Sequence, residues 1–424
     1  MNRVLTHDEA LARDDLDPQS ARRGEFHFPQ TADGTPAIYL CGNSLGLQPR
    51  AAAGAVARFM SEWQHLGVLG YHDARADWLN LHERLAPTLA TLAGAKREEV
   101  VAMHSLTINL HLLLASFYRP TRDRHVVLVE YGAFPSDRYA AVSQLAWHGQ
   151  EHAQSFVQVA PRSGEHLLRH EDLVAGIRHQ GERLALVLLP GIQYLTGQLF
   201  DLAALVREAH AVGALIGLDL AHAMGNVPLA LHDWDADFAV WCSYKYLNGG
   251  PGATAGAFVH ERHFDAELPR LAGWWGNDLE SRFDFAPEMR PYRGAAGWQV
   301  SNHPLLGMVP LEASLAQFAA AGMPALAARS RELTGWLERL LLERLGERIE
   351  ILTPREPEWR GAQLSVRLRG ARVGGRGLFA ALLAAGLTCD WREPDVIRLA
   401  PAPLYNTFED CWRAVALIER QLNA

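Results

Sequence analysis

The sequence predicts an α/β protein with a mainly parallel, doubly wound sheet in a large domain, followed by a smaller α+β domain. Three observations lead to this prediction. Short apolar runs typical of buried strands alternate with helical patterns between residues 100 and 260. From about residue 305 the pattern changes to long helices. The chain has 424 residues, 49% hydrophobic and 21% charged, which is enough for two domains.

The first hundred residues combine helices with turns. Residues 1–23 predict a helix and a loop, and residues 38–49 (IYLCGNSLGLQP) predict a short strand that runs into a glycine-containing turn. Apolar residues at helical spacing predict helices over residues 51–66 and 78–92. The loop between these two helices contains His72.

The large domain follows from the alternation of strands and helices. The expected strands cover residues 100–105, 125–130, 155–160, 184–190, 215–220, 237–243 and 255–260, with clear helices over 109–117 and 201–212. Neither GxGxxG nor GxxxxGK[ST] occurs, so no dinucleotide-binding or P-loop motif accompanies this alternation.

The C-terminal part has a different composition of elements. We expect helices over residues 311–321, 326–345 and 377–385, and strands over 348–352, 363–368 and 396–400. The predicted organisation is therefore an N-terminal segment (1–50) that packs with the small domain, a large domain (51–304) and a small domain (305–424).

Composition excludes several classes of protein. The net charge of −8 and the absence of any Lys/Arg run disfavour a nucleic-acid partner. The four cysteines are far apart and form no CxxC, which fits a reducing cytoplasm. The N-terminus is unlike a signal peptide, and no apolar run approaches the roughly 18 residues of a membrane span. The histidines are scattered without an HExxH motif, and we predict no metal.

The most informative stretch is residues 215–256. Two apolar runs in it end in Asp219 and in Lys245, and ligands of open α/β sheets bind at the carboxyl ends of the strands. A lysine amine beside a carboxylate is what pyridoxal 5′-phosphate requires. The side-chain-poor loop at residues 248–252 would let the backbone approach a ligand closely. The alternative is a solvated lysine at a strand end and an aspartate that caps a helix.

Three further positions have a functional and a structural interpretation. Thr107 lies at a strand-to-helix turn that could cradle a phosphate, or it could be an ordinary N-cap. Phe134 follows a strand and could stack on a flat heterocycle, or pack in the core. Arg398 lies inside an apolar strand, where it needs a partner such as a substrate carboxylate or a salt bridge to Glu393 or Asp395.

Together these segments resemble one family, kynureninase. The resemblance lies in CGNSLGLQP, SLTINLHLLL, FPSDRYA, GIQYLTGQ, DLAHAMGNVPLALHDW, WCSYKYLNGGPG, GWWGN, VSNHP and RLAPAPLYNTF, which run in the family's order from about residue 38 to 408. It implies a PLP-dependent, fold-type I homodimer of tryptophan catabolism. Such an enzyme hydrolyses L-kynurenine to anthranilate and L-alanine by cleaving the Cβ–Cγ bond.

The resemblance also implies roles for individual residues. Lys245 resembles the Schiff-base lysine that also moves the Cα proton, and Asp219 the partner of the ring nitrogen. Tyr244 reaches the phosphate and could act as a general acid/base. The cofactor site would comprise Leu106, Thr107, Phe134, Pro135, Ser136, Asp137, Asp219, His222, Tyr244, Lys245 and, across a dimer interface, Trp274 and Asn302. The substrate site would comprise Arg398, Ser44, His72, Asn277 and Ser301.

Two positions depart from the family pattern, and two rivals stay open. Asn277 stands where animal members have a histidine, which leaves the preference between kynurenine and 3-hydroxykynurenine open. Pro190 stands where they have a serine, which removes a possible side-chain contact near the cofactor. One rival is another fold-type I enzyme, a cysteine desulfurase or an aminotransferase. The other is a non-enzymatic PLP-binding regulator, for which the short stretch before the first motif leaves little room.

Overall fold

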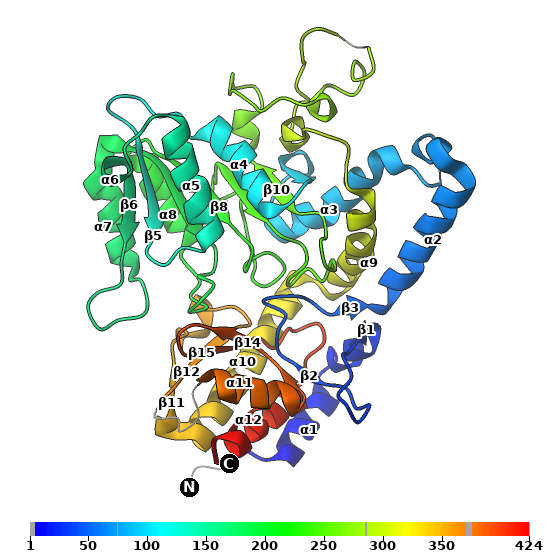
Figure 1. The fold of residues 1–424 in the computed structure, drawn as a ribbon, viewed down its shortest axis with the longest axis vertical. Coiled ribbons are helices and arrows are strands. Elements are labelled where there is room, and N and C mark those ends of the chain that lie inside the picture. The colour runs from blue at the N-terminus through cyan, green and yellow to red at the C-terminus, as the bar shows by residue number, and fades with distance from the viewer. Residues whose placement is uncertain (1–4, 74, 285, 370–374, 424) are drawn as a thin grey trace.

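A seven-stranded sheet forms the centre of the larger part of the molecule (Figure 1). The structure is a computed structural model that describes residues 5–73, 75–284, 286–369 and 375–423. In the order β4-β10-β9-β8-β7-β5-β6, the strands are β4 (Val100–Ala102), β10 (Gly256–Val259), β9 (Phe238–Trp241), β8 (Leu215–Asp219), β7 (Leu184–Pro190), β5 (Val126–Glu130) and β6 (Phe156–Val159).

Both faces of this sheet are buried except at its edge strand β6, which explains why its strands are mostly apolar. In β5, Val126 and Leu128 belong to one hydrophobic cluster, while Val127 and Val129 belong to another on the opposite face. The surrounding helices are α3 (Leu81–Ala93), α4 (Leu106–Phe117), α5 (Pro135–Trp147), α6 (His152–Ser155), α7 (His170–Gln180) and α8 (Leu202–Ala211). The predicted α/β class with a mainly parallel sheet is confirmed.

One strand departs from the parallel pattern. Strands β5 to β9 pair in parallel, whereas β10 runs antiparallel to both of its neighbours, β9 and β4. The chain reaches β10 from β9 through the loop at residues 242–255, and a connection without a crossover helix brings the next strand back antiparallel. That loop begins with the segment that carries Lys245.

A second sheet lies in the C-terminal part (Figure 1). Its antiparallel strands, in the order β11-β12-β15-β14, are β11 (Ile349–Ile351), β12 (Leu364–Leu368), β15 (Val396–Leu399) and β14 (Asp390–Arg392). The accompanying helices are α9 (Leu305–Ala321), α10 (Met323–Leu345), α11 (Gly375–Ala384) and α12 (Phe408–Asn423).

The N-terminal segment contacts this C-terminal part. Helix α1 (His7–Leu16) packs on α12, and β2 (Ile38–Tyr39) pairs in parallel with β13 (Leu387–Thr388). A short antiparallel pair, β1 (Phe26–His27) with β3 (Gln48–Pro49), precedes α2 (Arg50–Leu66), which packs along α9. The boundaries at residues 50 and 304 stay a prediction.

Two differences from the sequence-based expectation matter for the site. The strand expected over residues 100–105 ends at Ala102, and the next helix begins at Leu106 rather than at residue 109. Leu106 and Thr107 therefore lie in the first turn of α4. Strand β14, which has three residues, and helix α12 were not predicted, although the apolar residues of α12 recur at helical spacing.

No single helix in the described ranges has the length and apolar character needed to cross a membrane. By length and composition, α9 and the helix that follows it pass such a test only as a pair, across a bend of 84°.

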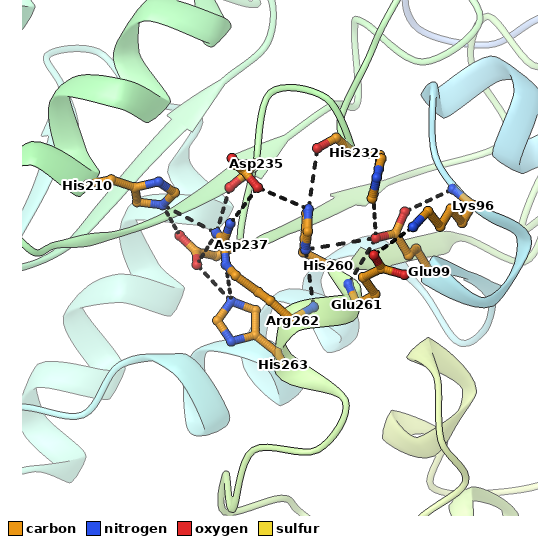
Figure 2. A network of polar contacts seen from close by, with 10 residues as sticks. All are labelled: Lys96, Glu99, His210, His232, Asp235, Asp237, His260, Glu261, Arg262 and His263. Carbon is orange, nitrogen blue, oxygen red and sulfur yellow. Dashed lines mark hydrogen bonds and ion pairs between the residues drawn. The ribbon is translucent and has the colours of Figure 1, made fainter.

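Asp237 organises a polar network at the amino end of β9, the end remote from Lys245 (Figure 2). Its buried carboxylate lies 3.0 Å from His210 Nε2, 2.8 Å from His263 Nε2 and 2.6 Å from Arg262 Nη2. It also accepts the backbone N–H of Ile216 at 2.7 Å. Burial alone would raise the pKa of Asp237, but hydrogen bonds from the histidines and the Arg262 charge hold that pKa well below its usual range.

A second buried carboxylate, Glu99, lies beside this network (Figure 2). Glu99 accepts the backbone N–H groups of Lys96 and Glu261 at 2.8 and 2.9 Å and faces His232 Nδ1 at 2.9 Å. The ligand-type atoms of Glu99, His232 and His260 lie within 4.8 Å of one another. Because His260 Nδ1 also accepts the Arg262 N–H at 3.2 Å, every one of these atoms is engaged in a hydrogen bond. We interpret the cluster as a structural brace, and the absence of a metal stays a prediction.

Replacing Asp237 with Asn should lower the thermal unfolding temperature substantially. Removing one partner of a buried charged network costs about 3–5 kcal/mol. Because the folded-state pKa lies below the unfolded value, this stabilisation is complete above about pH 5 and is lost as the pH falls further. The variant should consequently lose less stability than the wild type between about pH 5 and pH 3. Melting curves across this range measure both effects.

The matched control is Asp265→Asn, which removes an exposed carboxylate paired with Arg293. This change should leave the melting temperature nearly unchanged. Equal melting temperatures for Asp237→Asn and the wild type would contradict the assignment of Asp237 as an anchor.

Candidate active site

A pocket opens at the carboxyl edge of the large sheet, where several strands end together. Glu130, Pro190 and Asp219 are the last residues of β5, β7 and β8, and Lys245 follows β9. The lining consists of Leu106, Thr107, Glu130, Phe134, Ser136, Asp137, Pro190, Ile192, Tyr194, Asp219, Ala221, His222, Tyr244 and Lys245. Nine of the twelve residues predicted for the cofactor site are thus brought into one pocket.

Lys245 and His222 face each other inside the pocket. Lys245 Nζ lies 3.1 Å from His222 Nε2 and 5.9 Å from the centre of the Phe134 ring. Burial, and next to it the charge of Lys245, lowers the pKa of His222 well below its ordinary value. His222 is therefore neutral at physiological pH and can exchange hydrogen bonds with the lysine amine without repelling it.

Three carboxyl groups crowd the same pocket. Asp219 Oδ1 accepts the backbone N–H of Ala221 at 2.6 Å, which orients the carboxylate at the end of β8. Burial, with a smaller contribution from Asp219, raises the pKa of Glu130 to about 8. Burial and the adjacent Asp219 charge also raise the pKa of Asp137. Asp137 Oδ1 has no hydrogen-bond partner among the described residues. The arrangement favours a ligand that brings a protonated, positively charged group.

Two helices point their amino ends into the pocket. Thr107 in the first turn of α4 and Ser136 in the first turn of α5 place their hydroxyl oxygens 2.7 Å apart. In the described part of the chain, the N-cap residues Ser105 and Phe134 make no side-chain capping bond. The first N–H groups of α4 therefore stay available, whereas in α5 Pro135 has no N–H and the Asp137 N–H donates to the Phe134 carbonyl at 3.0 Å, so α5 offers mainly Ser136. Together with the helix dipoles, these groups favour an anion such as a phosphate.

These features together fit pyridoxal 5′-phosphate. Lys245 supplies the amine, and the Asp137–Asp219 pair offers negative charge for a protonated ring nitrogen. The paired helix ends can hold the phosphate, and Phe134 presents an aromatic ring beside Lys245. The His222 Nδ1 and Asp137 Oδ1 atoms, buried and without partners among the described residues, are groups that a bound ligand could satisfy.

Arg398 lies on β15, and its side chain is completely buried. It makes an ion pair with Asp390 on β14, with 2.6 Å between Nη2 and Oδ2, and donates from Nη1 to the backbone carbonyl of Tyr194 at 2.7 Å. The alternative pairing with Glu393 or Asp395 is wrong. The register places Asp390 directly opposite Arg398, whereas Glu393 and Asp395 pair with Arg376 and Arg367 outside this contact.

The remaining predicted site residues lie outside this pocket lining in the single chain described. Pro135 begins α5, and Ser44 contacts both Asp390 and Arg398. Asn302 Nδ2 donates to the Tyr71 hydroxyl at 3.0 Å, which brings the loop with His72 next to the loop with Ser301. Trp274 is half exposed. Asn277 uses both ends of its amide on the backbone of Ser281 and Arg290. Their roles stay predictions.

Four lining residues were not singled out by the sequence analysis: Glu130, Ile192, Tyr194 and Ala221. Glu130 carries the same signal as Asp219, a polar residue that ends an apolar strand, and could have been found by it. Ile192 and Tyr194 lie in the GIQYLTGQ segment, where nothing in the local pattern indicates a direction toward the pocket.

Comparison with known proteins gives concordant results. A family model described as the kynureninase C-terminal domain matches residues 326–418. Curated kynureninases from Koribacter versatilis and Xanthomonas oryzae are 49% and 52% identical over 419 residues, which is 99% of this chain and 98% and 99% of theirs. A kynureninase from Myxococcus xanthus is 52% identical over 97% of this chain and 96% of its own length.

Solved structures with the same fold are more distant in sequence. A cysteine desulfurase from Escherichia coli superposes with a TM-score of 0.78 at 20% identity, covering 96% of this chain and 99% of that one. A cystine C–S lyase in complex with cysteine persulfide gives a TM-score of 0.77 at 16% identity, covering 90% of this chain and 97% of that one. At these identities the likeness concerns the fold.

Proposed function

The chain belongs to the kynureninase family, and we propose on this basis that it hydrolyses L-kynurenine to anthranilate and L-alanine with pyridoxal 5′-phosphate as its cofactor. The observation that carries the proposal is the identity of about half of all residues over nearly the whole length of curated kynureninases. The pocket beside Lys245 supports it independently, because its groups suit this cofactor.

When bound, the cofactor supplies an electron sink for the bond changes at the substrate's Cα and Cβ atoms. Lys245 is the group that we propose to move the proton at Cα, with the neutral His222 3.1 Å from its amine. Asp219 would hold the ring nitrogen in its protonated form by placing negative charge beside it. Burial raises the pKa of the Tyr244 phenol, so Tyr244 stays protonated and can donate a proton as water adds to the γ-carbonyl.

The rival activity of a cysteine desulfurase is disfavoured by the state of the thiols. All four cysteines are free and buried, and burial raises the pKa of Cys389 and Cys41, the latter to about 11. A desulfurase needs a reactive thiolate, which burial opposes. An aminotransferase would release a keto acid in place of anthranilate and alanine, so product analysis separates that alternative.

We also propose that the protein is a cytoplasmic homodimer with shared active sites. The buried free cysteines suit a reducing compartment. An apolar groove lined by residues of α2, the 248–253 loop and the start of α9, together with the half-exposed Trp274, offers surface for a second copy. Trp274 and Asn302 would then complete the site of the neighbouring protomer.

The purified holoenzyme should release anthranilate from L-kynurenine and 3-hydroxyanthranilate from 3-hydroxy-L-kynurenine, with L-alanine in equal amounts. Both substrates carry the carboxylate, amine and γ-carbonyl that the proposed residues address. Measuring kcat/KM for both compounds on one preparation tests the assignment. If neither anthranilate nor 3-hydroxyanthranilate is released, the proposed function is wrong.

Replacing Lys245 with Ala should abolish turnover and the visible absorbance of the bound cofactor, because the only amine placed in the described pocket would be gone. The absorbance spectrum and a peptide map after borohydride reduction measure this. Lys96→Ala is the matched control, since that amine pairs with Glu261 on the surface. A reduced adduct on any lysine other than Lys245 would contradict the assignment.

Mixing Lys245→Ala with Trp274→Ala protomers should restore activity if each site draws on both chains. Only mixed dimers then hold one intact site, and random reassortment of two equal pools gives about a quarter of wild-type activity. Assays after subunit exchange, with sizing of the same samples, measure this. A fully active monomer would refute the shared site.

A further inference from the structure

Asp390 lies on β14, directly opposite Arg398 on β15. We propose that Asp390 is a positioning residue. It binds one edge of the Arg398 guanidinium and thereby orients the other edge toward the α-carboxylate of the substrate. This inference rests on the proposed function and on the role that the family resemblance implies for Arg398, binding of that carboxylate.

The sheet register fixes the position of Asp390. Asp390 and Arg398 are directly paired across the antiparallel strands β14 and β15, so their side chains lie on the same face. Ile397 and Leu399 point to the other face, into the core of the C-terminal part. Arg398 therefore faces the loop after β7, where it meets the Tyr194 carbonyl, and Tyr194 itself lines the cofactor pocket.

The hydrogen bonds of Arg398 leave one edge of the guanidinium for a ligand. Asp390 takes the edge formed by Nε and Nη2, at 3.3 and 2.6 Å. The Tyr194 carbonyl takes one Nη1 proton at 2.7 Å, and Ser44 Oγ lies 3.2 Å from Nη2. Of the five guanidinium protons, one on Nη1 has no acceptor among the described residues, and one on Nη2 meets a neutral hydroxyl.

A carboxylate can bind two N–H groups, and Nη1 and Nη2 each keep one N–H that no charged acceptor takes. Ser44 occupies the Nη2 position with an oxygen that carries no charge, so it yields to a carboxylate. Ser44 also donates to Asp390, and this contact gives its hydroxyl an acceptor. Because Asp390 accepts from Nε and Nη2, the Arg398 guanidinium keeps its orientation when the substrate carboxylate replaces the Ser44 hydroxyl at Nη2.

The charge balance of the site agrees with this role. Asp390 is shared between Arg398 and Arg392, whose Nη2 lies 3.2 Å from Oδ2. Two guanidinium groups and one carboxylate leave one net positive charge, which matches the single negative charge of an α-carboxylate. The charge of Arg392 thus compensates that of Asp390, and Asp390 does not cancel the attraction of Arg398 for the substrate carboxylate.

The test is Asp390→Asn, which keeps the shape of the side chain and removes its charge. If Asp390 positions Arg398, KM for L-kynurenine should rise about tenfold or more while kcat changes less than about threefold, since two lost fork contacts weaken binding only. If Asp390 merely competes for Arg398, the same change should lower KM. The sign of the KM change therefore decides the matter.

Two further measurements separate positioning from a general structural effect. Arg398→Lys should raise KM in the same way, and the double variant should be less than additive because both changes disturb one contact. A kynurenine analogue with hydrogen in place of the α-carboxylate should inhibit the wild type and Asp390→Asn equally. Glu393→Gln, on an exposed carboxylate near β14 that pairs with Arg376, is the matched control and should leave KM unchanged.

The outcomes are distinguishable. A wild-type enzyme that releases anthranilate, combined with an unchanged or lowered KM in Asp390→Asn, overturns the positioning role alone. A lower melting temperature with unchanged KM likewise assigns Asp390 to stability and not to binding. If the wild type releases no anthranilate, the proposed function fails first.

Discussion

The carboxyl edge of the parallel strands is the constraint on which the site depends. Strands that run side by side in one direction must end at one edge, and the side chains that follow them meet there. Glu130, Pro190 and Asp219 reach the pocket in this way, and Lys245 arrives after β9. The change of direction at β10 places the loop that carries Lys245 over this same edge.

The electrostatics of the pocket follow from that convergence. Glu130, Asp137 and Asp219 share a buried space with Lys245 and a neutral His222. Burial and mutual repulsion raise the pKa values of Glu130 and Asp137, so the pocket favours the binding of a positively charged group. The helix ends at Thr107 and Ser136 hold the opposite preference, for an anion. A ligand with a protonated ring at one end and a phosphate at the other satisfies both.

The substrate half of the site that we propose lies where the two sheets meet. The face of the small sheet that carries Ser365, Asp390 and Arg398 is polar, and it contacts the loop after β7 through Ser365 with the Leu195 carbonyl and Arg398 with the Tyr194 carbonyl. A buried arginine is costly without a partner, and Asp390 meets this need in a way that leaves one edge of the fork for a ligand.

The α/β class, most strands of the large sheet, and the pocket positions of Thr107, Phe134, Asp219 and Lys245 could be predicted from the sequence. These depend on local patterns, since an apolar run predicts a strand and the residue after it lies at the sheet edge. The pairing of Arg398 with Asp390, and the contact of Arg398 with Tyr194, 204 positions away, could not be predicted and emerge from the folded structure. Such contacts depend on strand register and on how one sheet packs against another, and neither property can be recognised in the pattern of residues adjacent in sequence.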